Sequence, residues 1–168
     1  MKRFIRYSMK QRQRGLASVE FAIAGLATII IIFAAIELAR LMFTVNALTE
    51  ASRRGARVAS VCLVSDTAEI SRLTIFNDSG TGTQSPILRN LTTDNVRIEY
   101  LNQDGAVLND ISGNNYLNIW YVRVRIANYQ HNFIFPGLDL TLTLPEYPTT
   151  VPRESLGVPR PGQTSTCV

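Results

Sequence analysis

Glu20 is the residue of this sequence whose type and position most strongly suggest a function. It is the single charged residue between Gly15 and Ile36, in a segment that is otherwise almost entirely apolar. A carboxylate in such a segment is costly unless an opposite charge compensates it, and it usually serves a function. We therefore expect Glu20 to meet a positive group. The alternative is a carboxylate that reaches the aqueous edge of a membrane and has no special role.

Cys62 and Cys167 are the two residues able to form a covalent cross-link. An even number of cysteines in an oxidising compartment predicts a disulfide. This bond would close a loop of about 100 residues and would stabilise the fold by about 4–5 kcal/mol in the chain-entropy model. The alternative is two unpaired thiols.

The sequence shows no grouping typical of a catalytic or metal centre. His131 is the single histidine, so we expect it to have a structural or surface role. Gly80 and Gly82 lie in a polar loop without a following lysine, unlike the glycines of a phosphate-binding loop. No Ser-His-Asp grouping is evident. We therefore expect no catalytic residue, no metal and no cofactor, and we do not expect an enzyme.

The segment that holds Glu20 is long enough to cross a membrane. From Leu16 to Leu38 it has 23 residues, which make about 35 Å of helix against a hydrocarbon core of about 30 Å. Before Gly15 the chain has six basic residues and no acidic one, which predicts a cytoplasmic N-terminus. The part after Arg40 then lies in a periplasmic or extracellular space. The basic residues are Lys2, Arg3, Arg6, Lys10, Arg12 and Arg14.

The net charge of +4 comes from this N-terminal leader. After Gly15, 11 basic residues face 13 acidic ones. A nucleic-acid-binding protein would carry its basic patch on the folded domain. The composition therefore gives no support to nucleic acid as a partner.

The helical pattern continues beyond the membrane segment, and one helix is predicted from near Ala17 to near Leu63. Gly55 interrupts this pattern, so we expect a kink or a close packing contact there. The helix is amphipathic in its second half, with residues at 3–4 residue spacing on one side. The apolar side holds Leu38, Leu41, Met42, Val45 and Leu48, and the opposite side holds Glu37, Arg40, Asn46, Glu50 and Arg54.

The remaining sequence predicts a small α+β domain. Two short helices are expected near 66–76 and 86–91. Alternating apolar residues then predict strands at 96–100, 120–126 and 138–144. Three successive strands favour a three-stranded antiparallel sheet, whose apolar face the amphipathic part of the long helix would cover.

Four segments follow from these assignments. We expect a leader at 1–15, a long helix at 16–64 with its transmembrane half at 16–38, the small α+β domain at 65–147, and a Pro-rich tail at 148–168. The tail is expected to be extended and irregular because of its prolines.

The leader, the glycine, the spacing to Glu20 and the apolar run together resemble the class III signal peptide of type IV pilins and pseudopilins. The pattern Arg-Gly-x-Ala-x-Val-Glu-Phe at 14–21, with Ala-Leu-Thr-Glu-Ala-Ser-Arg-Arg-Gly-Ala-Arg at 47–57, is more specifically similar to TadE-like pseudopilins of the tight-adherence (Tad/Flp, type IVc) pilus. The resemblance covers about the first 64 residues. Beyond them, only size and strand content match.

The resemblance implies a function in pilus assembly. In that family the prepilin peptidase, a membrane aspartyl protease, cuts after the glycine, here between Gly15 and Leu16. Glu20, followed by Phe21, would be the assembly residue that neutralises the Leu16 amine of a neighbouring subunit. The chain would be a minor pseudopilin with a pilin-like fold, needed to assemble a pilus for cell adhesion.

The resemblance also implies a location and a set of partners. The chain would be a single-pass protein of the bacterial inner membrane, with a cytoplasmic N-terminus and a periplasmic domain that reaches the pilus after assembly. The implied partners are the prepilin peptidase, TadF-like and other pseudopilins, the major Flp pilin and the inner-membrane assembly platform.

Two other functions stay open, and the mature N-terminus separates them from the first. A signal-anchored periplasmic binding module that enters no filament would keep Met1. A secreted protein cut by signal peptidase I after Ala35 or Ala39 would begin at Ile36 or Arg40.

Three arginines beyond the span have two interpretations as well. Arg53, Arg54 and Arg57 could form an interaction surface. Alternatively they belong to a solvated helix face, on which Glu50 pairs with Arg54 at i, i+4.

Overall fold

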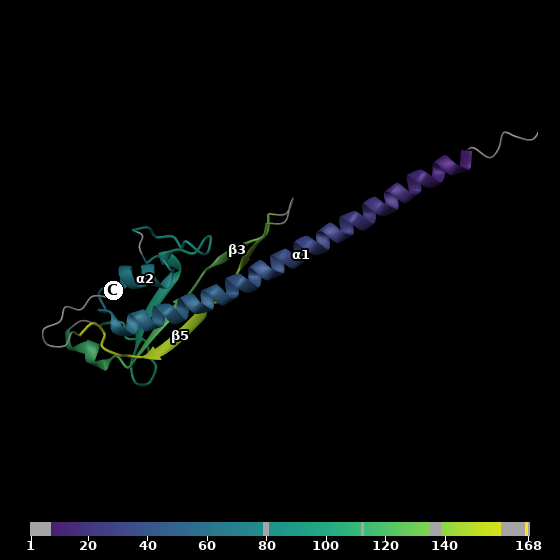
Figure 1. Cartoon of the computed structure of the whole chain (residues 1–168). Helices are drawn as coiled ribbons and strands as arrows, with labels where there is room; N and C mark the ends of the chain where they lie inside the picture. Colours follow the sequence, from purple (N-terminus) through teal and green to yellow (C-terminus); the bar gives the residue numbers. More distant parts are fainter. Residues whose placement is uncertain (1–7, 79–80, 112, 135–138, 159–166, 168) are drawn as a thin grey trace, which may run out of the picture.

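The computed structural model describes residues 8–78, 81–111, 113–134, 139–158 and 167. A long helix carries a small α+β domain on its C-terminal half, while its N-terminal half projects from the domain (Figure 1). The predicted α+β fold, with a long N-terminal helix packed on a small antiparallel sheet, is confirmed.

The helix α1 spans Ser8–Val61 as one element of 54 residues. It begins earlier than the predicted Ala17 and ends near the predicted Leu63. The other elements are α2 (Thr67–Thr74), η1 (Thr93–Asn95), β1 (Val96–Leu101), η2 (Gly113–Asn118), β2 (Tyr121–Ile126), β3 (Gln130–Asn132), β4 (Thr141–Thr143) and β5 (Tyr147–Pro152). The second short helix, predicted near 86–91, is not among these elements, since that segment forms bends followed by a turn at 89–90.

The main sheet has three antiparallel strands in the order β1-β2-β5. In the central strand, Val124 pairs with Ile98 of β1 on one side and with Thr149 of β5 on the other. The third strand of this sheet is therefore not the predicted one at 138–144. In the described part of that segment β4 is short, and it pairs with β3 in a separate two-stranded sheet.

The strand β5 corrects the prediction of an irregular tail from residue 148. It has two prolines, Pro148 and Pro152, and it lies at an edge of the sheet. The amide of Arg153 donates to Trp120 O, so the backbone N–H groups of the odd-numbered residues of this strand point toward β2. Both prolines are even-numbered, and their missing N–H groups point to the free edge, where they cost no ladder hydrogen bond.

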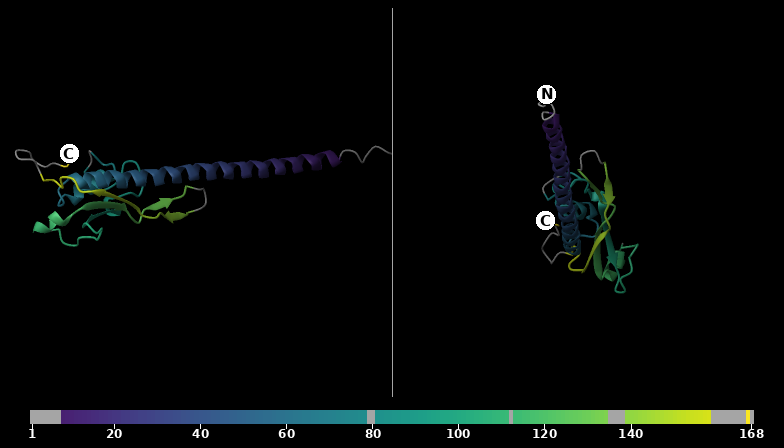
Figure 2. Two further views of the ribbon diagram at one scale, coloured as in Figure 1. Left: turned by 90° about the horizontal axis from the view of Figure 1, so that it is seen from below. Right: turned by 90° about the vertical axis from the view of Figure 1, so that its right-hand side faces the viewer.

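The core lies between one face of α1 and the main sheet, with α2 beside it (Figure 2). The C-terminal part of this α1 face, from Ala51 to Ala59, is rich in small residues, which lets the sheet approach the helix closely. Gly55 is the extreme case, because a Cβ atom there would lie 2.5 Å from Thr74 Oγ1 and 2.9 Å from Val124 Cγ1. Of the two expectations for Gly55, the close packing contact is the one that the structure has. The fully buried residues of the core include Leu48, Ala51, Ala56, Ala59, Ile70, Ile75, Val122 and Val124.

The segment after β5 caps the C-terminal end of α1. The amides of Glu154 and Leu156 donate to Ser60 O at 3.2 and 3.1 Å, and the amide of Gly157 donates to Val61 O at 2.8 Å. These bonds satisfy carbonyl groups that a helix end leaves without partners. Gly157 has a φ of 72° and a Cβ atom there would lie 2.5 Å from Leu63 Cγ, so this cap requires glycine.

Candidate functional site

The described part of the chain leaves the apolar half of α1 largely exposed. From residue 15 to residue 36 its side chains are exposed or half-buried, and the apolar window that qualifies as a candidate membrane span is 0% buried. Phe21 is 79% exposed and Leu16 is 63% exposed. Such a long exposed apolar surface requires lipid or other helices around it.

Gly15, Leu16, Glu20 and Phe21 all lie on this uncovered half. Glu20 is exposed, five residues after Gly15. A Cβ atom at Gly15 would meet nothing within 4 Å, so packing within the described chain does not require a glycine there. A requirement for glycine at this position would therefore come from another molecule.

Burial on α1 begins where the apolar segment ends. From residue 15 on, Glu37 is the first buried residue, and both of its carboxylate oxygens accept hydrogen bonds from Arg40 Nη1, at 2.6 and 2.8 Å. Its Oε1 also lies 3.4 Å from Nε2 of His131 in β3. The other ring nitrogen of His131 lies 3.4 Å from Thr44 Oγ1, and the ring meets Phe133 edge-on.

This junction corrects the prediction that Glu37 and Arg40 lie on the side of α1 opposite to its apolar side, since Glu37 is buried against the domain. The predicted apolar side of the helix is only partly right: Leu48 is buried and Leu41 and Val45 pack against the core, but Leu38 and Met42 are 59% and 50% exposed. The sequence contained one usable signal, the i, i+3 spacing of Glu37 and Arg40. The partner His131 could not be found in this way, because it lies in a distant hairpin.

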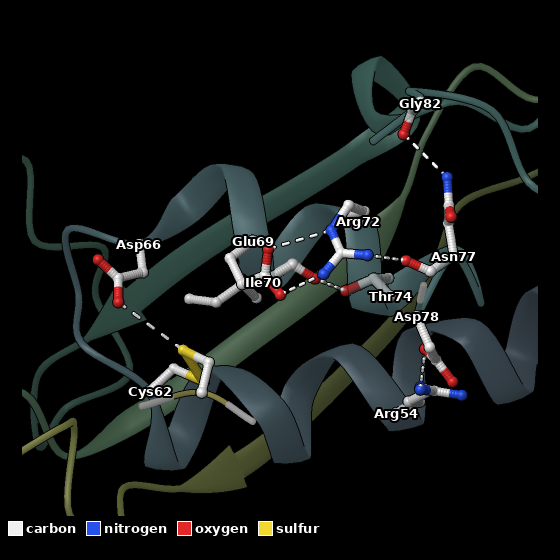
Figure 3. A network of polar contacts seen from close by, with 11 residues as sticks. Arg54, Cys62, Asp66, Glu69, Ile70, Arg72, Thr74, Asn77, Asp78 and Gly82 are labelled. Carbon is white, nitrogen blue, oxygen red and sulfur yellow. Dashed lines mark hydrogen bonds and ion pairs between the residues drawn. A yellow bond between two sulfur atoms is a disulfide. The ribbon is translucent and has the colours of Figure 1, made fainter. Parts of the chain in front are cut away.

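The three arginines do not act as one group in the structure. Arg53 and Arg57 are exposed, while Arg54 forms an ion pair with Asp78 and lies over the ring of Phe76, 5.6 Å from its centre. Figure 3 shows Arg54 and Asp78 next to a second pair, Glu69 with Arg72. The alternative in which Arg54 pairs with Glu50 is thus replaced by a contact to the loop after α2.

Cys62 and Cys167 lie together at the far end of the domain. The structure joins them in a disulfide, with their Cα atoms 5.0 Å apart. Cys62 is 2% exposed and belongs to the core, and Asp66 lies beside the bond (Figure 3). The bond connects the end of α1 to a residue far along the chain.

The chain is thus an α+β protein with one candidate membrane span at the N-terminal end of its long helix. A family model described as TadE-like protein matches residues 15–57. The match confirms the predicted resemblance over this segment and links the chain to the tight-adherence pilus system. No curated protein and no solved structure matches the chain.

The matched segment has clear structural limits. It starts at Gly15, where the apolar half of α1 begins, and it ends at Arg57, one turn before the end of this helix. It therefore includes the uncovered half of α1, the junction at Glu37 and the small-residue face around Gly55. The sheet lies outside it.

Proposed function

We propose that the chain is a minor pseudopilin, a structural rather than catalytic subunit needed to assemble a tight-adherence pilus. One observation carries this proposal. The helix that the TadE-like match covers from residue 15 to residue 57 has an uncovered apolar half and a half that packs in the core of a domain. Such a subunit can move from a bilayer into a helical bundle without refolding, because both environments cover the same apolar surface.

Processing by the prepilin peptidase follows from the same segment. The glycine that no internal packing requires precedes Leu16, and cleavage between them would free an amine at the start of the apolar helix. Glu20 lies about one helical turn further on. In a bundle of low dielectric constant, this carboxylate and the amine of a neighbouring Leu16 would compensate each other.

The orientation belongs to this proposal as well. The basic leader favours a cytoplasmic N-terminus, which places the domain and its disulfide in the oxidising periplasm. The proposed partners are the prepilin peptidase, other pilin and pseudopilin subunits, and the assembly platform of the inner membrane.

The mature N-terminus tests the proposal. We expect terminal sequencing of the chain from membranes to give Leu16, and we expect Gly15→Leu to leave the full-length precursor. Gly25→Leu is the matched control, since a Cβ atom at Gly25 also meets nothing within 4 Å. An N-terminus at Met1 would favour the anchored binding module, and one at Ile36 or Arg40 would favour a secreted protein.

A further inference from the structure

A pocket of about 270 Å³ opens beside the junction of the uncovered helix and the domain. It lies between α1, the loop before β1 and the strand β3. Arg40 and Thr44 line it from α1, Arg89 lines it from the loop, and His131 lines it from β3. None of the described residues that line it carries a carboxylate, so the charged groups in its wall are cationic.

The loop that carries Arg89 is fastened to the domain at this place. The hydroxyl of Tyr129 donates to Arg89 O at 2.7 Å, and Asn90 Nδ2 donates to Gln130 O at 3.3 Å. The guanidinium of Arg89 is exposed, and within the described part of the chain it has no ion pair and no hydrogen bond. Arg40 uses Nη1 for Glu37, which leaves the other nitrogens of its guanidinium to the pocket.

The pocket lies at the level where a bilayer surface would be. The predicted span ends at Leu38, and the residues of α1 that line the pocket follow it by two to six positions. They lie about 3–9 Å further along the helix axis. The polar headgroup layer on each side of the hydrocarbon core is about 5–8 Å thick.

Apolar side chains are exposed around this cationic centre. Phe43 and Ile134 line the pocket and are 56% and 60% exposed. Leu140 and Leu142 of the β3–β4 hairpin are exposed as well, although their alternation is typical of a strand with a buried face. Exposed apolar residues next to cationic ones are the pattern of a surface in the membrane interface.

We propose that this pocket binds the phosphate of an anionic phospholipid headgroup, taken from the leaflet on the domain side of the membrane. The two guanidinium groups would form charge-assisted hydrogen bonds with the phosphate oxygens. The acyl chains would run along Phe43 and the uncovered half of α1. The inference rests on the proposed function in one respect, namely that α1 spans the bilayer.

Lipid binding to the full chain in a neutral detergent tests this inference. Native mass spectrometry would count phosphatidylglycerol molecules retained as the lipid concentration is raised. We expect one saturable lipid per chain. Affinity should fall about fivefold in Arg89→Gln, in line with the contribution of one arginine near an anionic surface, and further in Arg89→Glu.

Arg57→Gln is the matched control, because Arg57 is exposed on α1 far from the pocket. It should leave the affinity unchanged. Equal losses in Arg89→Gln and Arg57→Gln, or no saturable lipid, would overturn the inference. Displacement of the lipid by an equal concentration of ammonium phosphate would assign the pocket to free phosphate, and this would also overturn the inference.

Extraction of membranes with alkaline carbonate separates this inference from the proposed function. Release of the wild-type chain would show that α1 does not span the bilayer, and the proposed function and the lipid-binding inference would then both fail. A chain that resists extraction but retains no lipid would contradict the lipid-binding inference and would leave the proposed function standing.

Discussion

Glu37 of α1 lies with its Oε1 atom 3.4 Å from Nε2 of His131, and this contact fastens the β3–β4 hairpin to the helix at the end of its apolar half. Arg40 holds the same carboxylate from one turn further on. The three side chains connect the part of the helix that the domain covers with the part that it leaves uncovered.

Glu37→Ala should loosen this hairpin. It removes both hydrogen bonds of half-buried Arg40 to the carboxylate and the contact with buried His131, at a cost of about 1–3 kcal/mol. Hydrogen exchange should become faster at the amides of β3 and stay unchanged in β1. Glu50→Ala is the control, because Glu50 is exposed on the same helix. Equal exchange in the two variants would mean that Glu37 does not hold the hairpin.

Gly55→Ala should destabilise the domain, although alanine favours a helix by about 1 kcal/mol. The new methyl group would lie within 3 Å of Thr74 and Val124, and overpacking of this kind costs about 1–3 kcal/mol. Urea unfolding in detergent, followed by the fluorescence of the single tryptophan, measures the loss. Gly25→Ala has open space around it and should leave the midpoint unchanged.

Glu20→Ala should leave membrane insertion unchanged or slightly improved, since it replaces a charge by an apolar group. Cleavage after Gly15 should persist. Incorporation into pili should fail, because the amine of a neighbouring Leu16 loses its counter-charge. The measurement compares the abundance of the variant in membranes and in sheared pili. Incorporation at the wild-type level would exclude Glu20 as an assembly contact.

Removal of the disulfide should destabilise the domain by about 4–5 kcal/mol in the chain-entropy model. Cys62→Ser and Cys167→Ser should each lower the urea midpoint, and the double variant should resemble either single one. In the exported wild type, alkylation without reductant should label neither cysteine. Labelling of both would show that the thiols are unpaired.

Tyr100 makes the domain sensitive to alkali. Burial, helped by the charge of Asp66, raises the pKa of Tyr100 from 10.0 to about 12. The folded chain therefore keeps the phenol proton while the unfolded chain releases it. The contribution of the Tyr100 phenol to the free energy of unfolding is fully present below pH 10. It falls by about 1.4 kcal/mol per pH unit between pH 10 and 12.

Tyr100→Phe should reduce this slope. Burial also raises the pKa of Tyr129 and of Tyr147, so a smaller slope should remain. At neutral pH the variant should be as stable as the wild type or slightly more so, because the buried Tyr100 hydroxyl has no hydrogen-bond partner among the described residues. Urea midpoints at pH 7, 10 and 11 would check both statements. If the stability of the variant fell with pH as steeply as that of the wild type, the alkali sensitivity could not be assigned to Tyr100.

The sequence could predict those features that depend on local pattern. The apolar run, the continuous helix and two strands of the sheet follow from periodicity, and the cost of glycine in a helix marks Gly55 as a special position without deciding between a kink and a close contact. The Glu20 motif also needs only sequence spacing, and the TadE-like match covers it.

Features that depend on pairing between distant segments could not be predicted. The leucines near 140 alternate like a buried strand, yet Leu140 and Leu142 face outward on a two-stranded hairpin. The prolines of 148–152 argued against a strand, but an edge accepts them when they point away from the neighbour. Burial of Glu37 likewise depends on His131, whose position only the tertiary fold determines.

The position of β5 has a consequence for the order in which the domain can form. The strand fills one edge of the main sheet and covers part of α1, and the residues after it cap that helix. In the proposed orientation, the N-terminus stays in the cytoplasm and the rest of the chain crosses the membrane in sequence order, so α1, β1 and β2 are in place before β5 arrives to cover their contact surfaces. Cys62 can then form its disulfide only after residue 167 has also crossed. In that orientation, translocation must reach residue 167 before the disulfide can close the domain, and a chain stalled earlier would leave the small-residue face of its helix open to proteases and chaperones.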